Sequence, residues 1–132
     1  DQGSNRRSLG GSSGFYESLT CDLCNWAEHQ FKLNRRDKDG ITEREHLEQV
    51  ERQIGRRPEA LEPPTDFPML LGHVWSAFCS LSFSRTAGFS GPNPINYTEL
   101  KYWKELTETP LSPWEIQVIM KLDSVYLGAI NV

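Results

Sequence analysis

The stretches INYTEL at residues 95–100 and LSPWEI at residues 111–116 decide how the last third of this chain folds. In each, Asn96 or Ser112 stands where a helix N-cap would be, and a glutamate follows three residues later. This pattern is a capping box, in which two side chains satisfy backbone N–H groups that a first helical turn leaves unpaired. The two stretches therefore predict two helices, joined through Thr109-Pro110 as a C-terminal helical hairpin.

The second helix of this hairpin is expected to be apolar nearly all round, from Trp114 to Ile130. A helix without a wide polar face has to be covered on two sides. In a chain this small, we expect a partner to cover one of those sides.

Three further helices are predicted upstream. Apolar residues over 15–34 recur at helical spacing, and Thr42 with Glu45 forms another capping box, whose helix ends at Gly55. Thr65 is expected to cap a central helix. The apolar face of that helix would consist of Phe67, Leu70, Leu71, Val74, Phe78 and Leu81. The predicted fold class is all-α, with about five helices in a small bundle that ends in the hairpin.

The chain of 132 residues has the length of one domain. Residues 1–14 are rich in glycine and serine and are interpreted as a flexible leader. Residues 15–132 are expected to form a single helical domain. Within it, residues 15–60 supply charged N-terminal helices, and residues 65–132 supply the apolar core with the hairpin.

Composition and motifs exclude several classes of function. The formal net charge of −4 provides no positive field for nucleic acid. The longest apolar-leaning run, residues 68–83, is too short and too polar to span a bilayer. The sequence has no phosphate-binding loop, no dinucleotide glycine fingerprint and no GxSxG motif. We therefore expect no catalytic centre, no cofactor, no nucleic acid and no membrane contact.

The three cysteines indicate a reducing compartment, because a secreted disulfide framework usually has a larger and even number. Cys21 and Cys24 form a CxxC motif, but the motif falls within a predicted helix with no strand before it. His29 and the distant Cys79 do not complete a recognisable set of zinc ligands. No metal is expected, although a small metal or redox protein using Cys21 and Cys24 is kept as an alternative.

Two other polar features favour structural roles. The DKDG stretch at 37–40 resembles part of a calcium-binding loop, but Arg35 and His46 stand where ligands are required. His73 lies near the apolar face of the central helix and is interpreted as a hydrogen-bonded core histidine.

Aromatic residues gather between residues 65 and 130, and tryptophan and tyrosine are frequent anchors of protein interfaces. Tyr102 and Trp103 are adjacent on a helix, so one of them should lie at a boundary or an interface. Asp123 lies in the most apolar stretch and needs a partner, such as a backbone N–H, a tyrosine, Lys101 or Lys104.

Several motifs in this half of the chain occur together in one order. They are GPNPINYTEL at 91–100, Trp103, Leu106-Thr107, LSPWEI at 111–116, Leu122-Asp123 and Tyr126-Leu127. This arrangement resembles the C-terminal part of tail assembly chaperones from long-tailed bacteriophages, over about residues 65–130. The first 60 residues carry no motif of this family.

Members of that family coat the long tape measure protein before the tail tube polymerises around it. The resemblance implies a non-enzymatic helical protein that binds the tape measure protein, self-associates and acts in the cytoplasm of the infected bacterial host. The candidate partner-binding residues are Tyr97, Tyr102, Trp103, Trp114, Asp123 and Tyr126. These residues could equally be markers of the fold. A structural virion component, such as a tail or neck adaptor, is the alternative function.

Overall fold

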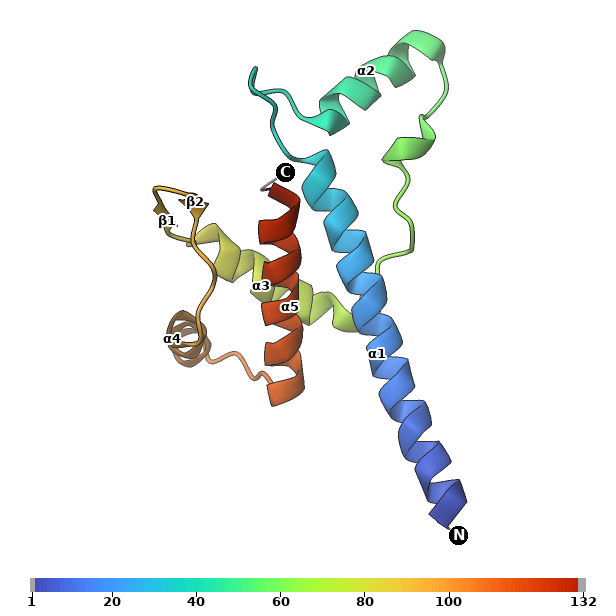
Figure 1. Cartoon of the computed structure of the whole chain (residues 1–132), viewed down its shortest axis with the longest axis vertical. Helices are drawn as coiled ribbons and strands as arrows, with labels where there is room; N and C mark the ends of the chain where they lie inside the picture. The colour runs from blue at the N-terminus through green and yellow to red at the C-terminus, as the bar shows by residue number, and fades with distance from the viewer. Residues whose placement is uncertain (1, 131–132) are drawn as a thin grey trace.

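A computed structural model describes residues 2–130 of the chain, with side chains from Gly14 onward. This part of the chain is predominantly helical and contains five α-helices, as predicted (Figure 1). The helices are α1 (Gln2–Leu33), α2 (Glu43–Ile54), α3 (Gly72–Phe83), α4 (Tyr97–Thr107) and α5 (Pro113–Ile130). Two 3-10 helices, η1 (Glu59–Leu61) and η2 (Met69–Leu71), and two short strands, β1 (Ala87–Gly88) and β2 (Gly91–Pro92), complete the described elements. The side chains of residues 1–13 are not described. The flexible leader predicted for residues 1–14 therefore stays a prediction.

The predicted starts of α2, α4 and α5 are confirmed. At α2, the Thr42 hydroxyl accepts the Glu45 N–H at 3.1 Å, and the Glu45 carboxylate accepts the Thr42 N–H at 3.4 Å. At α5, the Ser112 hydroxyl accepts the Glu115 N–H at 3.2 Å, and the Glu115 carboxylate accepts the Ser112 N–H at 2.8 Å. At α4, the side chain of Asn96 accepts the N–H three residues on at 2.8 Å. These caps satisfy backbone donors that would otherwise be left unpaired.

The predicted start of the third helix is wrong. The α-helix begins at Gly72 and not after Thr65, and the 3-10 turn η2 precedes it. Pro68 provides the physical reason, since a proline disfavours the helical conformation of the residue before it. Leu70, predicted on the apolar face, is 65% exposed as a result. The other predicted face residues are buried in the core or packed against it: Phe67, Leu71, Val74, Phe78 and Leu81.

Helix α5 lies at the centre of the fold. It runs beside α1, and α3 crosses the pair and packs on α5 as well (Figure 1). Its buried side chains are Val118, Ile119, Leu122, Asp123 and Ala129. Its exposed side is a narrow stripe made of Trp114, Gln117, Lys121, Ser124 and Gly128. The chain itself therefore covers this apolar helix on two sides and leaves one stripe exposed, so a partner at that stripe stays a prediction.

The two helices predicted as a hairpin, α4 and α5, both form, but they do not lie side by side along their lengths. Figure 1 shows α4 almost end-on next to α5, and α4 packs on α3. The chain turns at Glu108, which adopts a left-handed conformation with φ of 52°. The connector then buries Leu111 in the core before α5 begins.

Candidate partner-binding surface

The six predicted contact residues fall into an exposed group and an inner group. Tyr97 and Tyr102 on α4 are 58% and 57% exposed, and Trp114 at the start of α5 is 36% exposed. Trp103 and Tyr126 are partly buried against the core, and Asp123 is buried. Of the adjacent pair, Tyr102 is thus exposed and Trp103 packs against the core, and an interface at Tyr102 stays a prediction.

Asp123 is engaged inside the fold. Its Oδ2 accepts the backbone N–H of Ile95 at 2.9 Å, which confirms the expected backbone partner. Its Oδ1 lies 2.5 Å from Nη1 of Arg85, a residue that the sequence did not point to. The Arg85 guanidinium also lies 4.5 Å from the centre of the Tyr126 ring. In this conformation, Asp123 and Tyr126 therefore hold α5 to the end of α3 and to the start of α4.

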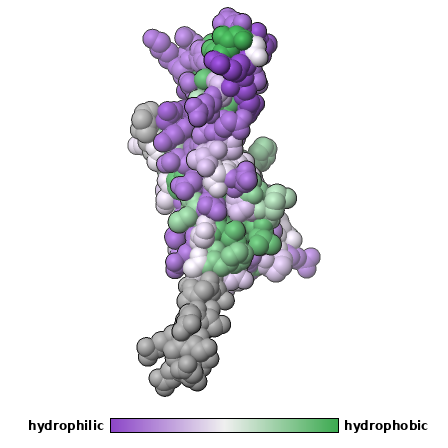
Figure 2. Space-filling view, turned by 90° about the vertical axis from the view of Figure 1, so that its right-hand side faces the viewer, coloured by the Kyte–Doolittle hydropathy of each residue, from purple (hydrophilic) through white to green (hydrophobic). Residues whose placement is uncertain are grey.

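Large exposed apolar side chains from three elements meet around Trp114. They are Phe15 and Tyr16 of α1, Leu70 of η2 and Trp114 itself, which together we call the Trp114 surface. The ring centres of Tyr16 and Trp114 are 5.1 Å apart. A hollow of about 690 Å³ opens between these side chains. Figure 2, which views the molecule from one side, shows a hydrophobic patch in the lower part of this face.

Local structure explains why these side chains stay outside the core. Leu70 is in η2, ahead of the α-helical register that buries Val74, because Pro68 delays the start of α3. Trp114 begins the exposed stripe of α5, one residue after the proline that opens the helix. Phe15 belongs to the apolar pattern of residues 15–34, and helical periodicity alone could not show that it is half exposed. Of this surface, only Trp114 was predicted as a contact residue.

His73 and Glu115 form a hydrogen bond at the edge of the hollow. Burial raises the pKa of Glu115, but the Ser112 N–H, His73 and the Ser112 hydroxyl outweigh it and lower the pKa below 4.5. These two residues are the acidic and basic side chains that line the hollow, and they are hydrogen-bonded to each other. The prediction of a core position for His73 is wrong, since its side chain is 54% exposed.

A second hollow of about 420 Å³ lies on the other side of Trp114 and includes Cys21, Cys24 and Lys121. Both cysteines are free thiols, and burial raises the pKa of Cys24. A raised pKa leaves less of the reactive thiolate at neutral pH. His29 lines a different hollow, so the structure does not bring it to the cysteines.

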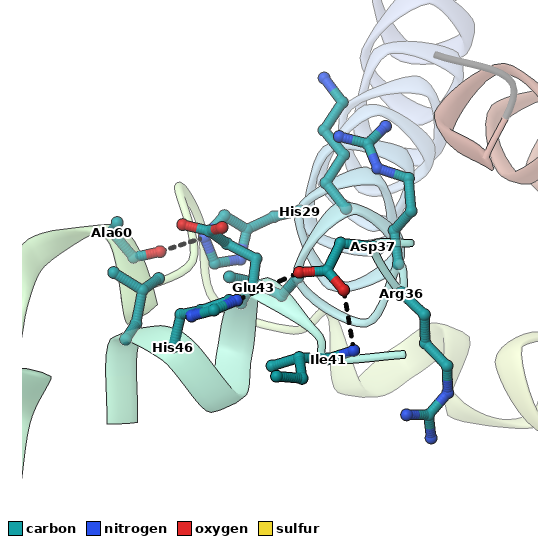
Figure 3. Close-up of a pocket in the computed structure, with 11 residues that line it drawn as sticks. His29, Arg36, Asp37, Ile41, Glu43, His46 and Ala60 are labelled. Atoms are coloured by element: carbon teal, nitrogen blue, oxygen red, sulfur yellow. Dashed lines mark hydrogen bonds and ion pairs between the residues drawn. The ribbon is translucent and has the colours of Figure 1, made fainter. Parts of the chain in front are cut away.

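That third hollow, of about 380 Å³, lies where α1 meets α2 and η1 (Figure 3). His29 donates through Nε2 to the carbonyl of Ala60 at 2.9 Å, and His46 lies 3.3 Å from the Asp37 carboxylate. The N–H of Ile41 and the His46 ring lower the pKa of Asp37. These polar groups pair with one another and attach α2 and η1 to the end of α1. Among the described residues, no group of three or more His, Cys, Asp or Glu side chains could hold a metal ion.

No helix in the described part of the chain has the length and apolar character needed to cross a membrane.

The sequence model of a phage tail assembly chaperone family matches residues 50–128, which is more than half of the chain. The match includes α3, α4 and most of α5, and it confirms the resemblance seen over residues 65–130. Leu70 and Trp114 lie inside the matched region, and Phe15 and Tyr16 lie before it. Searches of curated proteins and of solved structures gave no match.

Proposed function

The chain belongs to the phage tail assembly chaperone family, and we propose that it binds the tape measure protein during tail assembly. It acts without catalysis, in the cytoplasm of the infected bacterial host. The Trp114 surface holds an apolar helical segment of the tape measure protein and keeps that segment soluble.

The observation that carries this proposal is the exposure of four large apolar side chains at one place. Phe15, Tyr16, Leu70 and Trp114 are between 36% and 65% exposed and surround a single hollow. Contiguous apolar patches on soluble proteins commonly mark interaction sites. Tryptophan and tyrosine are also the residues most often found at the energetic centre of interfaces.

An amphipathic helix suits this surface. Its apolar side chains recur at three and four residues and lie about 5–6 Å apart, so neighbouring side chains can enter one groove. The hollow is open, and its acidic and basic side chains, Glu115 and His73, are hydrogen-bonded to each other. Apolar contacts do not require a fixed orientation of the two groups. This suits a protein that has to hold many different segments of a long partner.

The other predicted residues support this surface in different ways. Gln117 donates to the Tyr97 hydroxyl at 3.4 Å, so Tyr97 lies close to the exposed stripe that Trp114 begins. Tyr102 adds an exposed ring on α4. Trp103, Asp123 and Tyr126 act from within the fold, by keeping α4 and α5 in place.

Co-expression with the tape measure protein of the same phage tests the proposal. We expect a soluble complex that co-purifies, and we expect Trp114→Ala to weaken binding about tenfold or more, as truncation of an interface anchor does. Ile54→Ser is the matched control, because Ile54 is 56% exposed on α2. A tape measure protein that is equally soluble alone and does not co-purify would contradict the function. Equal binding by Trp114→Ala and the wild type would contradict the assignment to this surface.

A further inference from the structure

Two hollows follow one another along the seam between α1 and α5. The first is the hollow of the Trp114 surface, of about 690 Å³. The second, of about 420 Å³, includes Cys21, Cys24, Val118 and Lys121 in its walls, and we call it the Cys21 hollow. Among the described residues, Trp114 is the one that lines both hollows. Its side chain therefore separates two openings that a single partner can enter.

The direction of the two helices sets the spacing of the hollows. Tyr16 packs on Trp114 at the start of α5, and Arg35, just after α1, donates to the carbonyl of Ala129 near the end of α5. The helices therefore run in the same direction (Figure 1). On α1, the first hollow includes Tyr16 and the second is centred near Cys21. Five residues of an α-helix span roughly 7.5 Å, so the hollows are about one and a half turns apart.

Lys121 gives the Cys21 hollow a positive charge. It stands on the α5 wall, about two turns along the exposed stripe that Trp114 begins. Burial raises the pKa of the Cys24 thiol, and the Lys121 ammonium offsets part of that rise, so the ammonium lies near the hollow. Among the described residues, none forms an ion pair with Lys121. A cation in this position favours a partner that brings a carboxylate to it.

We infer that the tape measure segment held here is a helix that places one large apolar side chain in each hollow, on either side of Trp114, and a carboxylate against Lys121. This inference rests on the proposed function and specifies which segments the surface accepts. The two apolar side chains are four residues apart, because that spacing covers about 6 Å and keeps both on one face of the helix. A spacing of seven residues would cover about 10.5 Å, which is too long. The acidic residue lies one further turn along, on the side of Lys121.

The walls of the two hollows set which apolar side chain each one takes. The first hollow is the larger and has the rings of Phe15 and Tyr16 in its wall, so it suits an aromatic ring or a leucine. The Cys21 hollow is smaller, and beside Trp114 its apolar wall is Val118 with two thiols, which pack like small hydrophobic groups. It suits leucine or methionine. A charged side chain at either position would be buried without a counter-charge, which is costly.

Isothermal titration calorimetry of the whole chain with peptides tests the inferred pattern. The peptides overlap, are about 20 residues long and cover the tape measure protein of the same phage. We expect each peptide that binds to contain two large apolar residues four positions apart and an acidic residue one turn beyond them. Replacing either apolar residue by serine should weaken binding about tenfold or more. Tight binding by peptides that lack the pattern would overturn the inference.

Cys21→Trp tests the second hollow without touching the first. Cys21 is exposed, so the larger side chain can be accommodated and fills the opening. Binding should weaken about tenfold. Cys79→Trp is the matched control, because Cys79 is an exposed cysteine that lines neither hollow, and it should bind like the wild type. Circular dichroism verifies that both variants are folded, and wild-type affinity in a folded Cys21→Trp would overturn the inference.

An exchange of charges tests the carboxylate. Lys121→Glu replaces an attraction by a repulsion and should weaken binding roughly fivefold. Glu17→Lys makes the opposite change in the same hollow and should bind at least as tightly as the wild type. A peptide whose acidic residue is replaced by lysine should bind Lys121→Glu about as tightly as the original peptide binds the wild type. Failure of this rescue would overturn the assignment of the carboxylate to Lys121.

The outcome can be separated from that of the proposed function. If the wild type binds the tape measure protein and Trp114→Ala weakens binding, while Cys21→Trp and Lys121→Glu bind normally, the inference fails and the proposed function stands. If neither the tape measure protein nor any of its peptides binds the wild type, both fail.

Discussion

The guanidinium of Arg85 lies 2.5 Å from the carboxylate of Asp123, and both side chains are almost completely buried. Arg85 follows α3 and Asp123 is in α5, so the pair joins two helices at the centre of the fold. The same carboxylate accepts the N–H of Ile95, just before α4 begins. A polar residue in the most apolar helix thus sets the positions of its neighbours.

Arg85→Ala should lower the free energy of unfolding by about 3–5 kcal/mol, because it leaves the Asp123 carboxylate buried without its counter-charge. Urea unfolding followed by circular dichroism measures the loss. Arg57→Ala is the control: it breaks an ion pair with Glu62 whose side chains are half exposed, and should cost less than about 1 kcal/mol. Equal losses of unfolding free energy in the two variants would contradict the argument that burial makes the Arg85–Asp123 pair more important for stability.

Glu108→Gly should stabilise the protein by about 0.5–1 kcal/mol. Glu108 ends α4 with φ of 52° and ψ of 40°, a conformation that is strained for residues with a Cβ and favourable for glycine. The gain is partly offset by the greater freedom of glycine in the unfolded chain. Glu105→Gly makes the same substitution inside α4 and should destabilise by about 0.5–1 kcal/mol. Thermal unfolding of both variants checks the opposite signs, and a loss in both would contradict the strain argument.

Acid should remove a stabilising contribution of Glu115. Its pKa is lower in the folded protein than its ordinary value of 4.5, so the unfolded chain binds the proton more readily. The contribution is fully present above that ordinary value and is lost as the pH falls through the lower, folded pKa.

The matching measurement is urea unfolding from neutral pH down to about pH 3 for the wild type and Glu115→Gln. Glutamine also serves in a capping box, so this variant mainly removes the charge. We expect the wild type to lose about 0.5–1 kcal/mol more than the variant over this range. Identical pH profiles would contradict a role for the ionised carboxylate.

The helical class, the family and the starts of α2, α4 and α5 could all be predicted from the residues alone. Each of these rests on interactions within a few residues, such as the Ser112–Glu115 capping box. A local hydrogen bond between a cap and its first turn depends little on the rest of the chain, so its signature can be read directly. The start of α3 was missed although Pro68 carries the signal. The effect of that proline on the preceding residue outweighed the apolar periodicity.

Which apolar residues are covered and which remain exposed follows from how distant elements pack. Helix α5 looked apolar nearly all round, yet α1 and α3 cover all but a narrow exposed stripe of it. Leu70 looked buried, yet it joins Phe15 and Trp114 at the surface. Burial depends on which elements meet after folding, and contacts such as His73 with Glu115 link residues that are 42 positions apart. Helical periodicity indicates that a face is apolar; the packing of distant elements decides whether that face becomes core or a binding surface.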